Sequence, residues 1–345
     1  MSLNTMQTGN FLKGVAIVAV LINHYINHFS ELRSGGFANT VVLVFFFLSG
    51  YGIFTSLTKK ATGGVFRLEQ VAKFYLRRAI RIFPLFWIAY FAQGIIAPSD
   101  YSIVSFLGFQ SEGHYWFISS ILQCYIFAPF LVMLVVANRY AALLAVTILF
   151  GISVVLTDQS PITESVFNLF HFAKAPYLGI FFSHTYIFFL GMIFCTLILD
   201  EPTNERKSEE YRRFHNFAFV LLGSSALFYV LLEKYWLNLP LSGGILLLLC
   251  TCSYAVYNAI PAYFPPLSIV HFLGRHSYPV YLFHMSYYFI LGRLGFLSQG
   301  GWTGAFVLLL FSPLFISVAL LLEELSSWIT FKSENLLHLS KVSRV

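Results

Sequence analysis

The chain has 345 residues, of which 58% are apolar and only 10% are charged, and its mean hydropathy is +0.74. Soluble domains carry about 25% charged residues, so this composition excludes an ordinary soluble protein and indicates helices in a lipid bilayer. The net charge of +6 does not predict nucleic-acid binding, because the basic residues lie in short loops between apolar runs. The four cysteines lie in apolar segments without metal-ligand spacing, so we expect them to serve packing.

Apolar runs of roughly 17–23 residues, the length that crosses a bilayer as a helix, predict ten membrane spans. In chain order the predicted spans are 11–28, 38–57, 79–97, 116–137, 140–157, 179–199, 216–233, 241–260, 277–292 and 303–322. The first is expected to be a retained span, because it lacks the basic start and small-residue cleavage site of a signal peptide. The one long polar insert, Asp200–His215, is predicted to be a solvated loop. A single membrane domain over residues 1–345 is therefore expected, with a short C-terminal tail.

The distribution of lysine and arginine predicts the orientation. With the N-terminus inside, 17 of the 21 lysine and arginine residues fall on the cytoplasmic side. The four on the outside are Arg33, Lys174, Lys234 and Arg293. Because cytoplasmic loops of membrane proteins are enriched in these residues, both termini are expected inside. The predicted fold class is an all-α, multi-pass bundle of about ten transmembrane helices in the inner or plasma membrane.

Two ionisable residues lie within the first predicted span, Phe11–His28. Lys13 and His24 are eleven steps apart, and 100° per step brings both side chains to within about 20° of each other on one helix face. They lie roughly 16 Å apart along the axis, which puts Lys13 at the mouth of the membrane and His24 near its middle. Ionisable groups at such depth are costly and mark functional paths. Asn27, one turn beyond His24, is expected either to line the outer half of this path or only to cap the span at the membrane interface.

Basic residues also mark the cytoplasmic entry to the third predicted span. Arg78 and Arg81 are three residues apart and share a helix face, so they predict a two-pronged anion site at the inner membrane surface. Lys73 and Arg77 fit the simpler interpretation of anchoring to lipid phosphates. Arg81 lies deeper and is followed at once by apolar residues, and an arginine in that position usually has a partner.

Polar residues in two further spans are candidates for lining a site. Ser49, Gly50 and Gly52 in the second span permit close helix approach, and Ser49 offers a hydroxyl inside the bundle. In the ninth span, a polar stripe occupies positions i, i+4 and i+7 of an otherwise apolar helix. The stripe consists of Ser277, Tyr281 and His284. A single buried histidine is more often structural than catalytic, but its place in this stripe leaves both interpretations of His284 open.

Five sequence blocks occur together in this chain, in a fixed order. They are Lys13-x10-His24, Phe-Phe-Phe-Leu-Ser-Gly at 45–50, Arg78-x-x-Arg81, His114-Tyr-Trp116-Phe-Ile-Ser and the string Ser277–His284. Together with the ten spans, they resemble the signature of the acyltransferase family 3 membrane proteins over roughly residues 10–325. The chain differs from many members in one place, because Ile121, Leu122 and Gln123 stand where those members carry acidic residues. Glu112 or His114 is a candidate substitute for the acidic helper.

The resemblance implies transfer of an acyl group from cytoplasmic acyl-CoA to an acceptor hydroxyl, usually on a glycan, at or beyond the outer face. It implies that His24 is the catalytic histidine, that Lys13 is its basic partner and that Arg78 and Arg81 serve the donor, with Trp116 near the site. Acetyl-CoA is the expected co-substrate, with no bound cofactor. His24 could act as a general base on the acceptor hydroxyl or as an acyl-carrying nucleophile, and the sequence leaves both open.

Two other function classes share some of these features. A transporter of a small polar solute or glycan precursor also uses many spans and polar groups at the midplane. The fifteen Asp and Glu residues, however, can all be assigned to loops or span ends, which leaves no carboxylate for an ion relay. A metal-dependent enzyme is disfavoured because His24 and His28 are the only histidines spaced one turn apart, and no aspartate or glutamate lies between or next to them in the sequence to complete a metal site. No metal site is therefore expected.

Overall fold

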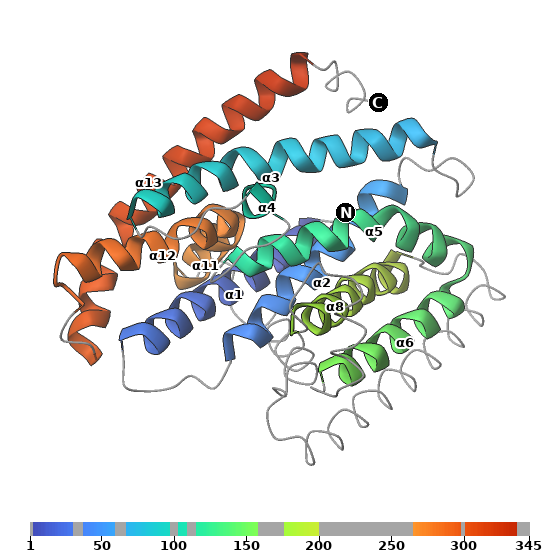
Figure 1. Cartoon of the computed structure of the whole chain (residues 1–345), viewed down its shortest axis with the longest axis horizontal. Coiled ribbons are helices and arrows are strands. Elements are labelled where there is room, and N and C mark those ends of the chain that lie inside the picture. The colour runs from blue at the N-terminus through green and yellow to red at the C-terminus, as the bar shows by residue number, and fades with distance from the viewer. Residues whose placement is uncertain are drawn as a thin grey trace. The chain divides into compact units, whose positions relative to one another are not determined.

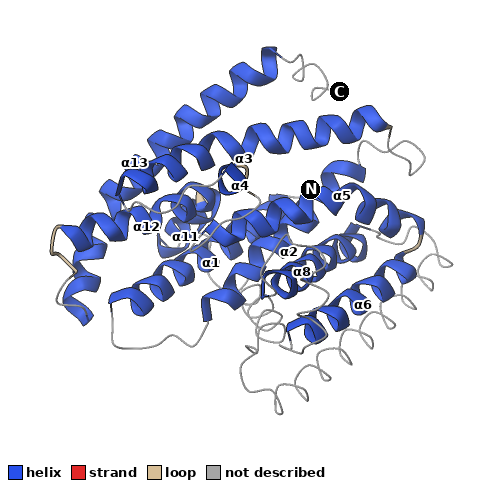
Figure 2. Cartoon of the chain, viewed as in Figure 1, coloured by secondary structure: helices blue, strands red, loops and turns tan. Residues whose placement is uncertain are grey.

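The computed structural model describes residues 3–29, 37–58, 67–96, 103–108, 115–157, 176–199, 265–297 and 301–336. Within these ranges the regular structure is helical and contains no β-strand (Figure 2). The helices, in chain order, are α1 (Leu3–Phe29), α2 (Phe37–Thr58), α3 (Leu68–Ile96), α4 (Ile103–Phe106), α5 (Trp116–Ala137), α6 (Arg139–Thr157), α8 (Pro176–Leu199), α11 (Pro265–Arg275), α12 (Ser277–Arg293) and α13 (Gly301–Leu336) (Figure 1). The all-helical prediction is confirmed for the described residues. The spans predicted at 216–233 and 241–260 lie outside them.

Four of the described helices are long and apolar enough to cross a membrane. Their membrane-capable stretches are Gly9–His28, Leu68–Ile96, Trp116–Ala137 and Trp302–Ser333. Shorter apolar stretches occur in α2, α6 and α8, at Val42–Thr58, Arg139–Ile148 and His184–Thr196. The chain therefore has the helices of a membrane protein, as its composition predicts.

Two helices extend beyond their predicted spans. The helix α3 begins at Leu68, eleven residues before the predicted start, so Lys73 and both arginines of the Arg78-x-x-Arg81 block lie within it. The helix α13 continues from the predicted end at residue 322 to Leu336. Hydropathy detects only the apolar part of a helix, whereas the polar residues that flank these spans contain no proline or glycine to end the helix.

The helix α11 was not predicted. Its eleven residues are too few to cross a bilayer, so a search for spans passes over it. Local signals were nevertheless present in the sequence, because Pro265 and Pro266 stand at its start and Gly274 stands near its end. Proline is favoured in the first turn of a helix and glycine close to its C-terminus.

The chain divides into two compact units. Unit 1 consists of Met1–Val42, Val71–Trp116 and Leu246–Val345, and unit 2 consists of Leu43–Gln70 and Phe117–Ile245. Unit 1 therefore holds α1, α11, α12, α13 and nearly all of α3, while unit 2 holds most of α2 and α5 together with α6 and α8.

In unit 1, α1 and α11 touch through their backbones. A Cβ atom added to Gly14 would overlap the carbonyl oxygen of Val270, and one added to Gly274 would overlap that of Asn10. Glycine is required at both positions because only a missing side chain allows two helices to approach this closely. Since residue numbers rise along α1 as they fall along α11, the two helices are antiparallel, and α11 packs at the level of Lys13.

Hydrogen bonds fix the directions of the other helices in unit 1. Tyr278 donates to the Ile82 carbonyl at 2.9 Å, and Ser286 donates to Gln93 Oε1 at 2.7 Å, so α12 and α3 run in the same direction. The helix α13 runs the opposite way. It accepts a hydrogen bond from Tyr287 at the Leu308 carbonyl, 2.7 Å away, and near its other end Thr330 donates to the Ile80 carbonyl at 3.2 Å.

In unit 2, α2 and α8 are also in backbone contact. A Cβ on Gly50 would overlap the carbonyl oxygen of Phe188, and the Thr55 hydroxyl lies 3.2 Å from the Cys195 sulfur. Cys124 and Cys195 are fully buried, as expected for packing residues, while Cys250 and Cys252 lie outside the described residues. Gly50 thus has the close-packing role that the sequence predicted. Gly52 does not, because it is exposed and a Cβ added there would have no atom within 4 Å.

Candidate functional site

The predicted site residues Lys13 and Arg81 come together in unit 1. Lys13 is half-buried on α1, and Arg81 on α3 lies close enough for the two positive charges to repel each other. Two neighbouring positive charges repel each other, and an anion that lies between them offsets this repulsion. The arrangement can therefore bind an anion at this end of α1.

The other arginine of the block is held differently. Arg78 is half-buried, and its guanidinium carbon lies 5.6 Å from the centre of the Phe74 ring, one turn earlier on α3. A cation over an aromatic face is stabilised, and its direction is restricted. Arg81 is exposed and is the more accessible of the two.

At the other end of α1, His24 meets the polar stripe of α12. The ring centres of His24 and His284 are 4.9 Å apart, and the planes are inclined at 47°. The ring of His28, one turn further along α1, is stacked with that of His24, with 6.0 Å between ring centres. The structure thus brings together two histidines that are 260 residues apart in sequence, on helices whose neighbourhood the sequence did not predict.

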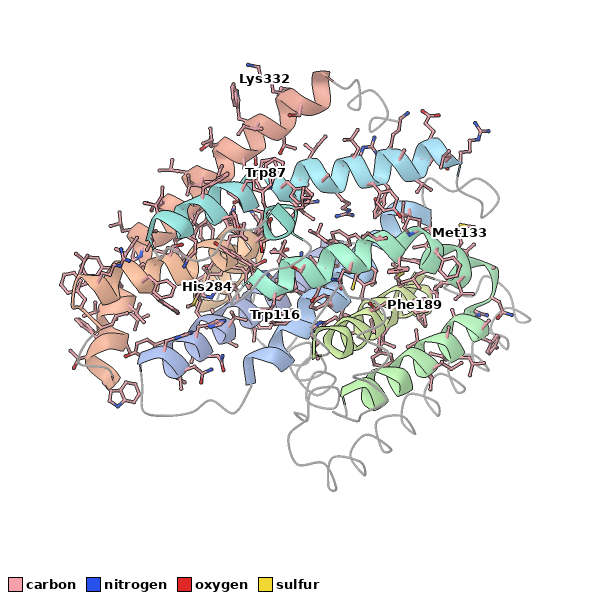
Figure 3. The ribbon with its side chains drawn as sticks, viewed as in Figure 1. Trp87, Trp116, Met133, Phe189, His284 and Lys332 are labelled. Carbon is pink, nitrogen blue, oxygen red and sulfur yellow. The ribbon has the colours of Figure 1, made fainter. Side chains whose placement is uncertain are left out.

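All three members of the stripe on α12 are buried. Ser277 is 7%, Tyr281 5% and His284 0% exposed. His284, labelled in Figure 3, lies inside unit 1 with its Nδ1 atom bonded to the Tyr281 carbonyl oxygen. The stripe therefore faces the interior of the unit, as its spacing predicted.

The remaining candidates are less closely grouped. Asn27 is exposed near the end of α1, and Trp116 is half-buried at the start of α5. Ser49 is half-buried in unit 2, whereas the other candidates belong to unit 1. Glu112 and His114, the candidates to replace the missing acidic helper, lie outside the described residues.

Several polar residues near these candidates were missed at the level of sequence. Tyr288 extends the stripe by one turn and donates to the Leu21 carbonyl at 2.7 Å. Gln93 and Ser286 form a buried hydrogen bond between α3 and α12. The signal available in the sequence was that Gln93 and Ser286 are polar residues inside apolar spans. The sequence does not tell, however, which spans are neighbours.

Charged and titratable groups surround the end of unit 1 that holds Lys13. The ring of His271 on α11 contacts Phe11, with 5.9 Å between ring centres. Burial, and to a lesser extent the charge of Arg275, lowers the pKa of His271. His276 Nδ1 lies 2.6 Å from a Glu323 carboxylate oxygen and ties α12 to α13. Glu323 belongs to the part of α13 beyond the predicted span, which is why this pair was not predicted.

Within the described ranges, no group of three histidine, cysteine or acidic side chains could hold a metal ion. The site chemistry available from these residues is that of cationic and imidazole groups: anion binding at Lys13 and Arg81, and proton transfer at His24. These are the functions needed to bind a phosphorylated donor and to activate a hydroxyl.

A family model described as an acyltransferase domain, acyltransferase family 3, matches residues 10–322. The chain therefore belongs to this family, which confirms the resemblance seen in the sequence and indicates a membrane enzyme of acyl transfer. The transporter alternative is correspondingly disfavoured. No curated protein and no solved structure matches the chain.

Proposed function

We propose that the protein transfers an acyl group, acetyl in the first instance, from cytoplasmic acyl-CoA to a hydroxyl of a cell-surface glycan or a related small acceptor. Lys13, Arg78 and Arg81 bind the phosphates of the donor, and His24 carries out proton transfer. The observation that carries this proposal is the approach of Lys13 to Arg81, because two neighbouring cations at the membrane surface together attract an anionic ligand.

The spacing along α1 supports CoA as this ligand. Lys13 and His24 lie roughly 16 Å apart along the helix axis. The pantetheine arm of CoA has about thirteen bonds between phosphorus and sulfur, and an extended chain advances about 1.2 Å per bond, which gives about 16 Å. A donor whose phosphates lie at Lys13 and Arg81 therefore brings its thioester to the level of His24.

The proposed chemistry is a single acyl transfer. His24 accepts the proton of the acceptor hydroxyl as its oxygen attacks the thioester carbonyl carbon and forms the new C–O bond. The tetrahedral intermediate collapses, the C–S bond breaks, and the sulfur takes the proton back from His24. The products are an ester and CoA with a free thiol.

We also propose the ten-span topology with both termini in the cytoplasm, in the plasma membrane. Contacts within unit 1 support this topology, because helix ends that it places on the same side of the membrane touch one another. Residues expected at the cytoplasmic surface contact one another, as in the pairs Asn10–Gly274 and Ile80–Thr330. The parallel course of α3 and α12 fits as well, since segments that cross in one direction are separated by an odd number of spans, and the scheme has five between them.

The acyl group is proposed to cross within the protein, along the face of α1 that carries Lys13 and His24. CoA is too charged to pass, whereas an acetyl thioester arm is slender. In sealed vesicles of known orientation, acetyl-CoA on the cytoplasmic side alone should acylate acceptor held on the other side. Transfer only when both share a compartment would refute the crossing while leaving acyl transfer intact.

Variants separate donor binding from chemistry. Each arginine contributes charge-assisted hydrogen bonds worth roughly 1.5–3 kcal/mol, so Arg81→Ala should weaken CoA binding about 10- to 100-fold. Arg81→Lys should restore only part of this, because lysine cannot grip two oxygens in a bidentate manner. Arg77→Ala, one turn away and expected to contact lipid, is the matched control. His24→Ala should abolish transfer and leave CoA binding within about twofold of wild type.

The measurements are CoA binding to purified protein in nanodiscs and mass-spectrometric detection of new ester groups on surface glycans. Equal loss of CoA binding in folded His24→Ala and Arg81→Ala would show that the division of roles is wrong. Unchanged CoA binding in Arg81→Ala would remove the anion site from the proposal.

A further inference from the structure

The polar stripe of α12 begins close to the two cations Lys13 and Arg81. Gly274, shortly before the stripe, lies against the backbone of α1 at Asn10, three residues from Lys13. The hydroxyl of Tyr278 donates to the backbone carbonyl of the residue that follows Arg81 on α3, at 2.9 Å. The start of α12 therefore lies beside both of the segments that carry the cations.

The stripe ends at the level of His24. The ring centres of His24 and His284 are 4.9 Å apart. Because Gly274 contacts α1 near its start and His284 contacts it near its end, α12 runs alongside α1 in the same direction. Ser277 is seven steps before His284, and 100° per step brings the two to within about 20° of each other on the helix, so Ser277 faces α1 as well.

The stripe therefore follows the course proposed for the donor. Ser277 lies seven residues and Tyr281 three residues before His284, which is about 10.5 Å and about 4.5 Å along the axis. In an acyl-CoA whose phosphates lie at the two cations, the thioester lies at the level of His24. The carbonyl carbons of the two amides in the pantetheine arm are four and eight bonds from the sulfur, or about 5 Å and about 10 Å at about 1.2 Å per bond. The two positions that carry hydroxyls are thus spaced like the two amides.

Neutral hydroxyls suit this stretch of the donor. Between the phosphates and the thioester the arm carries no charge, and an amide that is buried without a hydrogen bond is costly. The hydroxyls of serine and tyrosine can donate to an amide carbonyl or accept from an amide N–H. Ser277 is 7% and Tyr281 5% exposed, so hydrogen bonds to them form away from water.

We infer that the stripe binds the pantetheine arm, with Ser277 hydrogen-bonded to the amide nearer the phosphates and Tyr281 to the amide nearer the sulfur. This assignment rests on the proposed acyl transfer and adds to it the recognition of the uncharged part of the donor. Lys13 and Arg81 bind the phosphates, and the stripe leads the arm along α1 to His24. Because no covalent bond is made or broken at the stripe, its two hydroxyls bind the donor and take no part in the chemistry.

Truncated donors test the role of Ser277. Acetyl-CoA and S-acetylpantetheine carry both amides, whereas S-acetyl-N-acetylcysteamine carries only the amide nearer the sulfur. Ser277→Ala should lower kcat/KM about three- to tenfold for the first two, as expected for one neutral hydrogen bond, and leave it within about 1.5-fold for the third. Arg81→Ala should affect acetyl-CoA alone, because the other two donors lack phosphates. A fragment that is a poor substrate is measured as a competitive inhibitor of transfer from acetyl-CoA.

The same logic applies to Tyr281. Tyr281→Phe keeps the ring and its packing but removes the hydroxyl. It should lower kcat/KM about three- to tenfold for all three donors, since each carries the amide nearer the sulfur. Ethyl thioacetate, which has neither amide, should react equally with the variant and the wild type.

Ser286→Ala is the matched control. Ser286 is buried on the same helix, but its hydroxyl donates to Gln93 on α3. Its loss should lower the thermal midpoint in detergent and leave the relative kcat/KM of the three donors as in the wild type. Ser277→Thr keeps a hydroxyl and should retain most of the kcat/KM for acetyl-CoA. Should Ser277→Ala fail to fold, Ser277→Cys makes the same comparison, because a thiol is a weak hydrogen-bonding group.

Failure of the inference is distinguishable from failure of the proposed function. A wild type that transfers no acyl group from acetyl-CoA would overturn the function and the inference with it. An active wild type in which Ser277→Ala lowers kcat/KM equally for all three donors would show that Ser277 only supports the fold, and would overturn the inference alone. So would a folded Ser277→Ala variant with unchanged kcat/KM for acetyl-CoA, or a Tyr281→Phe variant that loses as much with ethyl thioacetate as with acetyl-CoA.

Discussion

The glycine contact between α1 and α11 predicts that a single methyl group destabilises the protein at one position and not at another on the same helix. A Cβ on Gly14 would overlap the Val270 carbonyl oxygen, whereas one on Gly9 would have no atom within 4 Å. Both residues lie in α1, so the helix-propensity gain of Gly→Ala, about 1 kcal/mol, applies to both. The two variants therefore differ only in the contact with α11.

The size of the effect follows from the nature of the obstacle. The carbonyl of Val270 is backbone and cannot rotate away, so α1 and α11 must separate by about 1 Å. A gap of that size forfeits a quarter to a half of the dispersion energy between facing atoms, and overpacking of this kind costs about 1–3 kcal/mol. Gly14→Ala should thus be about 1–3 kcal/mol less stable than Gly9→Ala.

Thermal unfolding of the purified protein in detergent measures this difference. At about 2 °C per kcal/mol for a long chain, the two midpoints should differ by roughly 2–6 °C. Gly274→Ala should resemble Gly14→Ala, because its Cβ would overlap the Asn10 carbonyl of the same interface. The double variant should cost less than the sum, since one separation of the helices relieves both overlaps. Equal midpoints for Gly9→Ala and Gly14→Ala would refute the backbone contact.

Three other predictions concern topology, the contact between His276 and Glu323, and pH. After replacement of the native cysteines, Glu164→Cys should react with a membrane-impermeant maleimide in intact cells, and Lys60→Cys should not. Both positions lie outside the described residues. Labelling of Lys60→Cys would show that the orientation is the reverse of the predicted one. Glu323→Gln should lower the free energy of unfolding by about 1 kcal/mol through loss of the contact with His276. If the stability losses of Glu323→Gln and His276→Gln simply add in the double variant, the contact contributes nothing. Because burial and a nearby arginine lower the pKa of His271, the unfolded chain binds a proton that the folded chain does not as pH falls below about 6.5. Stability should therefore fall below that pH, and less so in His271→Gln; identical acid unfolding of the two proteins would contradict the shift.

The sequence alone determined the helical membrane class, the helices that carry the candidate residues and the family. These features are local. A long apolar run must form helix in lipid because its backbone groups have no other partners there. The spacing of Lys13 and His24, and that of Ser277, Tyr281 and His284, sets which side chains share a face of one helix. The family blocks are likewise short strings that can be read one at a time.

The tertiary structure decided which helices are neighbours. The sequence places Lys13 and Arg81 on separate spans and His24 and His284 on separate spans, without information about their distance. The helix α11, missed because it is too short to span, packs against α1 through two glycines whose partners lie about 260 residues away. Most apolar faces in lipid are equally acceptable to one another, so hydropathy does not select partners. Close glycine contacts and interhelical hydrogen bonds select them, and these depend on three-dimensional fit.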